Sequence, residues 1–493
     1  MVVTCDNYVG GAFVAPKGGA YQDVRAPANG KVVARVALSS AADVDAAVQR
    51  AKAALPGWQA LTIKSRAAAM FKLHHLLQEN AEELAKLVTL ENGKTLSESL
   101  ASVAKGNETV EWSCSLPQLA QGRTQQVSRG VTCADQMDPL GIVGCIVPFN
   151  FPLMVPMWTT PIALTMGNCV ILKPSEKVPM TMSRVAELVK QAGVPDGVFQ
   201  LVQGAVDVVN AICDHPDISA VTFVGSSKVA DLVYKRCHLH NKRVLALGGA
   251  KNHLIALKDC DVAMAASDIV GSFAGCAGQR CMAASVLLTV GEQPALVQRI
   301  VESAAALTPG QAPGQMGPVI DAAALQRVLG YIDEAERGGA QILVDGRKWA
   351  REHPDGFWVG PTVILHTNPA DRALHDEIFG PVLSILKVDS NERALAIENA
   401  NPYGNAACIY TNSGAAAEWF APRFRAGMIG VNVGIPVPRE PFSFGGMYGT
   451  LSKYGEHDIT GEGAMRFFTT LRKITTKWSK FEVGANEDKA QFK

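Results

Sequence analysis

The sequence predicts an α/β fold made of two doubly wound domains and a small β element. The chain has 493 residues, whereas a single hydrophobic core rarely grows beyond about 250–300 residues. Short runs rich in Val and Ile alternate with helical patterns in two successive series, as in parallel sheets covered by helices on both faces. Hydrophobic residues make up 48% of the chain and charged residues 19%, which is typical of a globular protein.

Residues 1–122 are expected to begin with strands and to continue with helices. Ser40 and Asp43 form a capping pattern before an apolar stripe at helical spacing that extends from residue 44 to residue 55. The pair Pro56-Gly57 is expected to end this helix. Further helical stripes cover residues 70–77 and 84–88, and another helix is expected to begin near Ser97.

The two series of buried strands define the two domains. The first series occupies residues 141–147, 169–172, 199–202, 220–224 and 244–247. The second series occupies residues 254–257, 285–290, 341–344, 362–365, 382–388 and 407–410. We therefore expect one domain from residues 1–122 and 141–247, and another from residues 248–468.

Residues 139–172 lack charged side chains and so resemble a membrane span. Prolines at positions 148, 152, 156 and 161 argue against a span, because each removes a backbone donor. A buried strand followed by an irregular loop is expected instead. The N-terminus carries no export signal, so a cytoplasmic location is expected, or a mitochondrial one if a presequence precedes these residues.

Residues 123–140 and 469–493 fit neither sheet. Both stretches contain alternating apolar and polar residues, a pattern of strands that pair at an exposed edge. We expect them to form an oligomerisation element of a homodimer or homotetramer.

The charge balance and the cysteines exclude several classes of protein. Lys and Arg together number 46, as do Asp and Glu, so the positive field used by nucleic-acid and membrane binders is absent and no such partner is expected. The eleven cysteines form no Cys-x-x-Cys pair, and a reducing compartment is predicted for them. His and Cys residues show no metal-ligand spacing, so no metal is expected.

The sharpest chemical signal is the small-residue loop at positions 275–283, Gly-Cys-Ala-Gly-Gln-Arg-Cys-Met-Ala. We predict that Cys281 is a nucleophile, because a neighbouring Arg280 would favour its thiolate. Cys276 is expected to be an ordinary buried thiol with no cation beside it. No Gly-x-Gly-x-x-Gly occurs, so the usual dinucleotide fingerprint is missing.

Six motifs in order resemble the aldehyde dehydrogenase superfamily. They are Gly278-Gln-Arg-Cys281, Pro148-Phe-Asn-Phe-Pro152, Lys173-Pro-Ser-Glu176, Phe223-Val-Gly-Ser226, Leu247-Gly-Gly-Ala-Lys251 and Glu377-Ile-Phe-Gly-Pro381. Within the superfamily, residues 148–158, 249–253 and 278–283 are similar to the CoA-acylating methylmalonate-semialdehyde dehydrogenase branch. The resemblance implies the aldehyde dehydrogenase fold, with a Rossmann-like NAD-binding domain (1–122 and 141–247) and a catalytic domain (248–468).

The resemblance also implies site residues. Catalysis would use Cys281, which forms a thioester, and Asn150, whose amide would stabilise the oxyanion together with the Cys281 backbone N–H. The NAD-binding residues would be Phe149, Lys173, Ser175, Glu176, Gly225, Ser226, Gly248, Glu377 and Phe379. The aldehyde would contact Arg280, Lys105, Phe151 and Phe444. Glu176 would accept hydrogen bonds from ribose hydroxyls and repel a 2′-phosphate, which favours NAD over NADP.

The expected reaction is the NAD-dependent oxidation of a methylmalonate or malonate semialdehyde to an acyl-CoA, with coenzyme A as co-substrate and loss of CO2. Ala246 replaces the glutamate with which hydrolytic relatives activate water, and Lys105 replaces an arginine of the branch. Ala230 replaces a glycine that relatives carry near the phosphates. Two alternatives stay open: a hydrolytic aldehyde dehydrogenase in which a carboxylate such as Glu377 assists water, and a non-enzymatic binding or structural relative.

Overall fold

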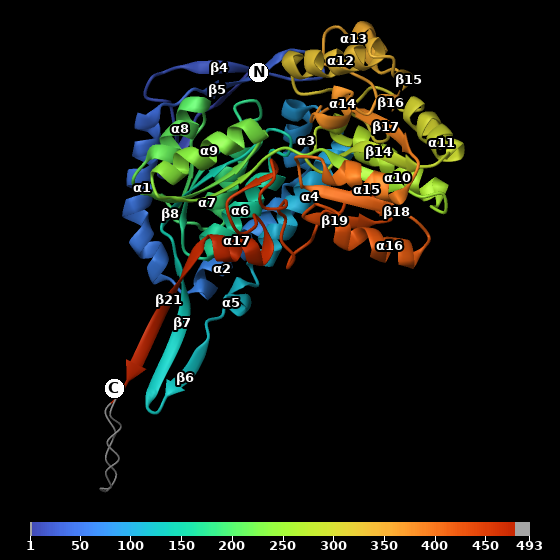
Figure 1. The fold of residues 1–493 in the computed structure, drawn as a ribbon. Helices are drawn as coiled ribbons and strands as arrows, with labels where there is room; N and C mark the ends of the chain where they lie inside the picture. The colour runs from blue at the N-terminus through green and yellow to red at the C-terminus, as the bar shows by residue number, and fades with distance from the viewer. Residues whose placement is uncertain (1, 479–493) are drawn as a thin grey trace.

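The computed structural model describes residues 2–478. Two α/β bodies lie side by side, and a long hairpin projects from the first of them (Figure 1). The part of the predicted oligomerisation element at 479–493 lies outside the described residues.

The first body contains an eight-stranded sheet that is parallel except at its two edges, where β20 and the β2–β3 hairpin are antiparallel. The strand order is β20 (Lys453–Tyr454), β12 (Arg243–Leu247), β11 (Ile218–Val224), β8 (Ile142–Ile146), β9 (Cys169–Lys173), β10 (Phe199–Leu201), β2 (Asn7–Val9) and β3 (Ala12–Val14). Its helices are α1 (Ala41–Ala60), α2 (Ile63–Glu79), α3 (Ala81–Asn92), α4 (Leu96–Ser113), α5 (Leu116–Leu119), α6 (Met154–Thr165), α7 (Met180–Gln191), α8 (Val206–Asp214), α9 (Ser227–Leu239) and α17 (Gly461–Phe467).

The second body contains a seven-stranded sheet that is parallel except for β15. The order is β15 (Gln341–Val344), β16 (Thr362–His366), β17 (Val382–Val388), β14 (Ala284–Val290), β13 (Asn252–Ala256), β18 (Ala406–Tyr410) and β19 (Met428–Val431). Its helices are α10 (Val262–Ala274), α11 (Pro294–Ala305), α12 (Ala322–Arg337), α13 (Arg347–Glu352), α14 (Arg372–His375), α15 (Asn391–Asn399) and α16 (Gly414–Phe420).

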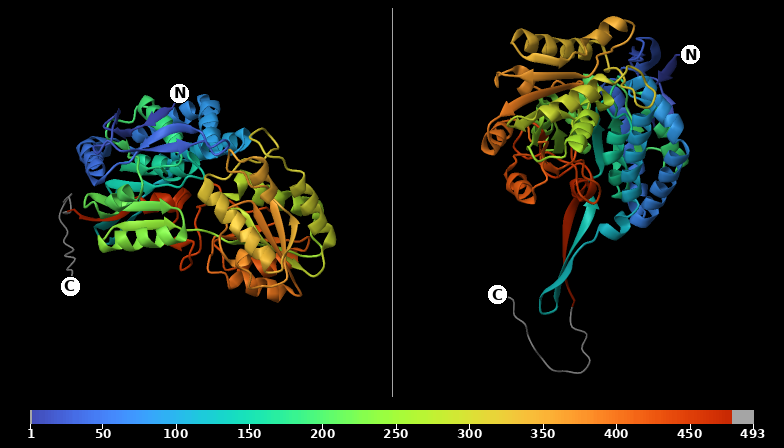
Figure 2. Two further views of the ribbon diagram at one scale, coloured as in Figure 1. Left: turned by 90° about the horizontal axis from the view of Figure 1, so that it is seen from above. Right: turned by 90° about the vertical axis from the view of Figure 1, so that its right-hand side faces the viewer.

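Two small sheets complete the described chain. One has the order β1 (Val3–Cys5), β5 (Val32–Ala37) and β4 (Tyr21–Arg25), and the other has the order β21 (Thr469–Lys477), β7 (Val131–Pro139) and β6 (Thr124–Ser128). The second one forms the arm that projects from the body in Figure 1 and in the right-hand view of Figure 2. It joins the two segments that the sequence assigned to neither sheet.

Each predicted apolar run lies in a strand, because continuously buried strands are apolar on both faces. The capping pattern at the start of α1 is also confirmed, since the Asp43 carboxylate accepts the Ser40 N–H at 2.8 Å. The predicted end of this helix at Pro56 is wrong. The helix continues to Ala60, and its last turn is anchored by Trp58, which is buried and donates to the Leu164 carbonyl oxygen at 3.0 Å.

The irregular loop expected after residue 147 is in part a helix, α6. Pro156 lies in its first turn, where a backbone N–H has no acceptor within the helix, so only Pro161 removes a helical bond. The whole of the helix after Met154 is buried between α4, α17 and the sheet. This burial on all sides explains why the segment is uncharged without spanning a membrane.

Candidate active site

Cys281 lies at the junction of the two bodies, in the loop between α10 and β14. Its carbonyl oxygen accepts bonds from Asn252 Nδ2 at 2.8 Å and Asn405 Nδ2 at 3.0 Å, both from the second body. Its side chain is half-buried and packs against the hydrophobic core of the first body. The predicted nucleophile is therefore held by one domain and faces the other.

The turn before Cys281 has an unusual backbone. Cys276 and Ala277 both have φ of 52°, and Gly278 follows with φ of 68°. A Cβ atom at position 278 would collide with the Gly380 carbonyl oxygen, so the turn packs directly on the loop that carries Phe379. Phe379 itself has φ of 55°. Two strained loops thus fix each other beside the nucleophile, and such strain is typical of functional sites.

Asn150 is buried and is held beside the Cys281 loop. Its side-chain Nδ2 donates to the Gln279 carbonyl oxygen at 3.0 Å, while its own backbone oxygen accepts from Lys94 Nζ at 2.7 Å. The Lys94 ammonium also lies 4.0 Å from the centre of the Phe151 ring. One amide hydrogen of Asn150 is left over, and its Oδ1 is buried without a partner. The remaining amide hydrogen can donate to a substrate oxygen, as an oxyanion-stabilising side chain requires.

The prediction that Arg280 favours the thiolate of Cys281 is wrong. Burial, followed by the nearby Glu377 carboxylate, raises the pKa of the Cys281 thiol to about 12. The backbone N–H groups of Cys281 and Met282 act in the opposite direction but do not outweigh burial. Arg280 does not contribute. The adjacent position in the sequence therefore does not place the guanidinium beside this sulfur.

Arg280 faces Cys276 instead. Its Nη2 donates to Cys276 Sγ at 3.2 Å and lies 3.6 Å from Glu98 Oε1. Lys94 also lies close enough to Cys276 to interact with it. The expectation that Cys276 has no cation beside it is thus wrong, because both Arg280 and Lys94 lie beside its sulfur.

Lys173, the last residue of β9, and Glu176 form a largely buried pair. The Lys173 ammonium lies 3.0 Å from Glu176 Oε2, and Ser175 Oγ accepts the Lys177 N–H at 3.3 Å. Burial would raise the pKa of Glu176, but Lys173 and Lys177 together with its own backbone N–H lower it overall. The carboxylate is therefore ionised and placed at the carboxyl end of a central strand, where dinucleotides bind in this type of sheet.

The N-terminus of α9 offers a second element of a dinucleotide site. Ser226 occupies the N-cap position and its side chain makes no capping bond, so the first amides of the helix remain for an anion. Gly225 continues the chain from β11, and a Cβ there would collide with the ring of Phe223. Gly248 has a different constraint, since a Cβ would meet the Leu451 carbonyl oxygen.

Glu377 and Phe379 close the site from the second body. Glu377 Oε1 accepts the Ala250 N–H at 2.8 Å, and burial raises the pKa of this carboxyl to about 7. The Phe379 and Phe149 rings meet edge to face, with their centres 5.9 Å apart. The residues predicted to bind a nicotinamide thus come from both domains.

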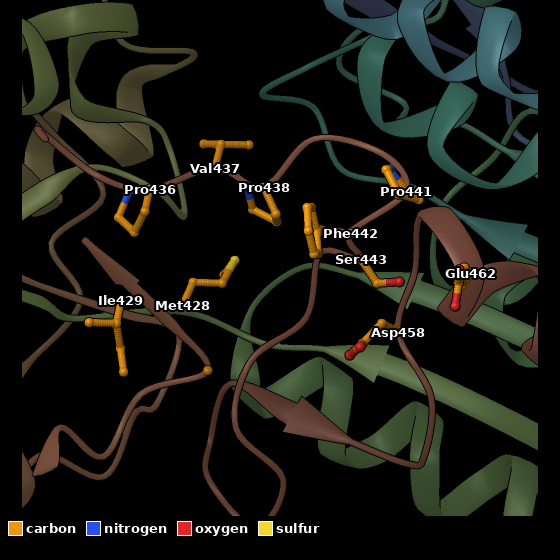
Figure 3. Close-up of a pocket in the computed structure, with 11 residues that line it drawn as sticks. Met428, Ile429, Pro436, Val437, Pro438, Pro441, Phe442, Ser443, Asp458 and Glu462 are labelled. Atoms are coloured by element: carbon orange, nitrogen blue, oxygen red, sulfur yellow. The ribbon is translucent and has the colours of Figure 1, made fainter. Parts of the chain in front are cut away.

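The residues predicted to contact the aldehyde divide into two groups. Phe151 is half-buried near Asn150, and Lys105 lies on α4. Phe444 is buried, and its ring centre lies 4.6 Å from that of Trp158 on α6. Phe442, two residues before it, is exposed and lines a cavity of about 600 Å³ beside Pro438 and Pro441 (Figure 3).

Sequence reasoning missed two charged residues beside the Cys281 loop, Lys94 and Glu98, and the contact of Lys105 with Glu440. Their contacts join segments far apart in the chain, so no local pattern marked them. Over residues 2–478, no group of His, Cys, Asp and Glu could hold a metal ion, and no helix is long and apolar enough to cross a membrane.

Comparison with known proteins settles the family. The aldehyde dehydrogenase family model matches residues 13–474. This chain is a member of the aldehyde dehydrogenase family. Malonate-semialdehyde dehydrogenase 2 of Geobacillus kaustophilus is 42% identical over 97% of this chain and 99% of that protein. These findings confirm the family resemblance and the predicted class of enzyme.

Solved structures confirm the fold of this aldehyde dehydrogenase. The methylmalonate-semialdehyde dehydrogenase of Oceanimonas doudoroffii matches with a TM-score of 0.95 and 37% identity, over 97% of this chain and 99% of that one. A Sinorhizobium meliloti structure described as a methylmalonate-semialdehyde dehydrogenase in complex with NAD also has a TM-score of 0.95, at 38% identity and the same coverage. Both relatives carry the name of the branch that the sequence motifs indicated.

Proposed function

We propose that this aldehyde dehydrogenase oxidises malonate semialdehyde or methylmalonate semialdehyde with NAD and releases an acyl-CoA. The observation that carries the proposal is the convergence of Cys281, Asn150 and Glu377 at the domain junction. The names of the relatives supply the substrate class. The charged pair Lys173–Glu176 and the uncapped start of α9 fit an NAD molecule, whose nicotinamide accepts a hydride.

The residues of the chain would act in a fixed order. Cys281 Sγ attacks the aldehyde carbon after losing its proton, and the resulting oxyanion takes hydrogen bonds from the free Asn150 amide hydrogen and the Cys281 backbone N–H. Loss of a hydride from that carbon leaves a thioester on Cys281. Glu176 and Lys173 would hold a ribose of NAD, and Phe379 and Phe149 would position its nicotinamide ring, which supplies the hydride acceptor. Arg280 and Lys105 bind the substrate carboxylate, which later leaves as CO2 while a proton takes its place on carbon.

Deacylation is expected to need coenzyme A. Ala246 is fully buried in β12, next to Tyr454 of β20 and Phe223 of β11, and its methyl group accepts no proton from water. A thiol needs less activation, since its pKa lies nearer neutrality. CoA would therefore take the acyl group by thiol exchange and restore Cys281.

The test is a burst experiment with malonate semialdehyde. We expect one equivalent of NADH per subunit without CoA, then a stall, and steady turnover to an acyl-CoA when CoA is added. Ala246→Glu is expected to regain part of the CoA-free turnover. Ala246→Gln introduces a side chain of the same size as Glu but without a basic group, so it is not expected to regain this turnover. Sustained NADH formation without any thiol would refute the CoA step.

A hydrolytic aldehyde dehydrogenase is the second candidate, and one observation favours it. Glu377 acts electrostatically on Cys281, and its pKa of about 7 suits a general base. In that case Glu377→Gln would abolish steady turnover in the absence of CoA. The same experiment thus separates the two reactions.

The proposal extends to assembly and location. The arm formed by β6, β7 and β21 carries the exposed apolar residues Leu471 and Ile474, which supports its use as the contact of a homodimer or homotetramer. All eleven cysteines are free thiols, which supports a reducing compartment such as the cytoplasm.

A further inference from the structure

One face of α4 connects the Cys281 loop to the segment at 436–442. At 100° per residue, Glu98, Ser102, Lys105 and Thr109 lie within a narrow arc of this helix. At the first end, Glu98 contacts the Arg280 guanidinium and accepts the Cys276 N–H at 2.6 Å. At the other end, Thr109 contacts Glu440. Both cations proposed to bind the substrate carboxylate lie along this face.

Neither cation is free in this structure. Lys105 Nζ lies 2.6 Å from Glu108 Oε2 and 3.9 Å from Glu440 Oε2. Arg280 is shared between Glu98 and Cys276. A substrate carboxylate must therefore compete with carboxylates of the protein, and the question is which of them sets the outcome.

The three carboxylates differ in what else they do. Glu98 also accepts the Thr95 N–H at 3.0 Å and so caps α4, which makes it part of the framework. Glu108 is 40% exposed and lies one turn from Lys105 on the same helix, where an ion pair is weak. Glu440 is only 9% exposed and comes from a distant segment of the chain. Burial strengthens its effect on a neighbouring charge.

Glu440 is also held in place. Thr109 Oγ1 donates to Glu440 Oε1 at 3.1 Å, which leaves Oε2 directed to Lys105. The prolines on either side of residues 439–440 line the cavity wall in Figure 3. Two buried polar atoms near the same face, Ser102 Oγ and Arg280 Nε, have no partner, so hydrogen-bond donors remain there for a ligand oxygen.

We propose that Glu440 is a specificity-determining residue, which competes with the substrate carboxylate for Lys105 and so lowers the preference for carboxylated aldehydes. The inference rests on the proposed function, because it takes Lys105 as a substrate contact. The inference goes beyond the proposed function because it names the protein carboxylate, that of Glu440, which competes with the substrate. Replacement of Glu440 by Gln removes the charge and keeps an oxygen that Thr109 can bond.

The experiment compares malonate semialdehyde with propanal, using NAD and CoA in excess. Glu440→Gln is expected to raise the ratio of the two kcat/KM values about tenfold, mainly through a lower KM for the semialdehyde. In a Lys105→Gln background the same change is expected to have less than half of this effect on a logarithmic scale. Glu462→Gln is the matched control, because Glu462 is a carboxylate of the neighbouring cavity wall that faces Arg466.

A binding measurement separates this inference from the proposed function. Malonate, as an unreactive probe, is expected to bind the Glu440→Gln protein about tenfold more tightly than the unaltered protein in calorimetric titration, and the Glu462→Gln protein equally. If the unaltered protein oxidises no semialdehyde, the proposed function fails while malonate affinity still decides the role of Glu440. Unchanged or weaker malonate binding by the Glu440→Gln protein would overturn the inference.

Discussion

The high pKa of the Cys281 thiol leads to a quantitative prediction about its reactivity without NAD. An ordinary thiol has a pKa of 9.0, and burial together with Glu377 raises that of Cys281 to about 12. At pH 8 the thiolate fraction then falls from roughly 0.1 to roughly 0.0001, so alkylation is expected to be about 1,000-fold slower than for an exposed thiol.

Glu377→Gln tests the electrostatic part of this effect. Removing a negative charge favours the thiolate and lowers the pKa of the thiol. Burial is the larger cause, so the substitution is expected to recover less than half of the rise, which corresponds to a roughly 3- to 30-fold faster reaction with iodoacetamide at pH 8. Gln keeps an oxygen that can accept the Ala250 N–H, so the loop should persist.

The assay is mass spectrometry of tryptic peptides after timed exposure to iodoacetamide at pH 7 to 9.5. Trypsin cleaves after Arg280 and so places Cys276 and Cys281 on separate peptides. Asp376→Asn is the control, because this carboxyl lies on the same loop but accepts the Tyr331 hydroxyl at 2.8 Å. Labelling of Cys281 that Glu377→Gln leaves unchanged, or that Asp376→Asn accelerates equally, would refute the reasoning.

Three further predictions concern cofactor, folding and assembly. Glu176→Gln is expected to narrow the preference for NAD over NADP several-fold in kcat/KM, because the charge that repels a 2′-phosphate is lost; equal kcat/KM values for the two cofactors in the unaltered protein would contradict this. Gly278→Ala is expected to lower the free energy of unfolding by more than about 2 kcal/mol in urea titration, since φ is 68° and a Cβ would meet a backbone oxygen. Gly330→Ala lies in a helix where a Cβ would meet no neighbouring atom, and it is expected to raise the free energy of unfolding by up to about 1 kcal/mol. Replacing both Leu471 and Ile474 by Asp is expected to reduce the mass of the oligomer measured by analytical ultracentrifugation. An unchanged mass would exclude the arm as the contact between subunits.

The sequence alone located the strands and the close-packed loop of the predicted nucleophile. Parallel strands buried on both faces must be apolar throughout, so each run in the two series could be located within a few residues. The glycines around Cys281 were readable for a similar reason, because a loop packed this closely against another backbone requires them, as Gly278 against Gly380 shows. Both signals are local and need no knowledge of distant contacts.

Only the tertiary structure decided how the charges pair. Arg280 is adjacent to Cys281 in the sequence, yet its guanidinium lies against Cys276 and Glu98. Lys105 pairs with Glu108 on its own helix and also lies 3.9 Å from Glu440, which comes from a distant part of the chain. The helix at Pro156 persists because it is buried on every side, although its local pattern predicted a loop. Hydrophobic periodicity is a local property of the sequence. The partner of a charged side chain, and hence its pKa, depends instead on which groups the fold brings within a few ångströms.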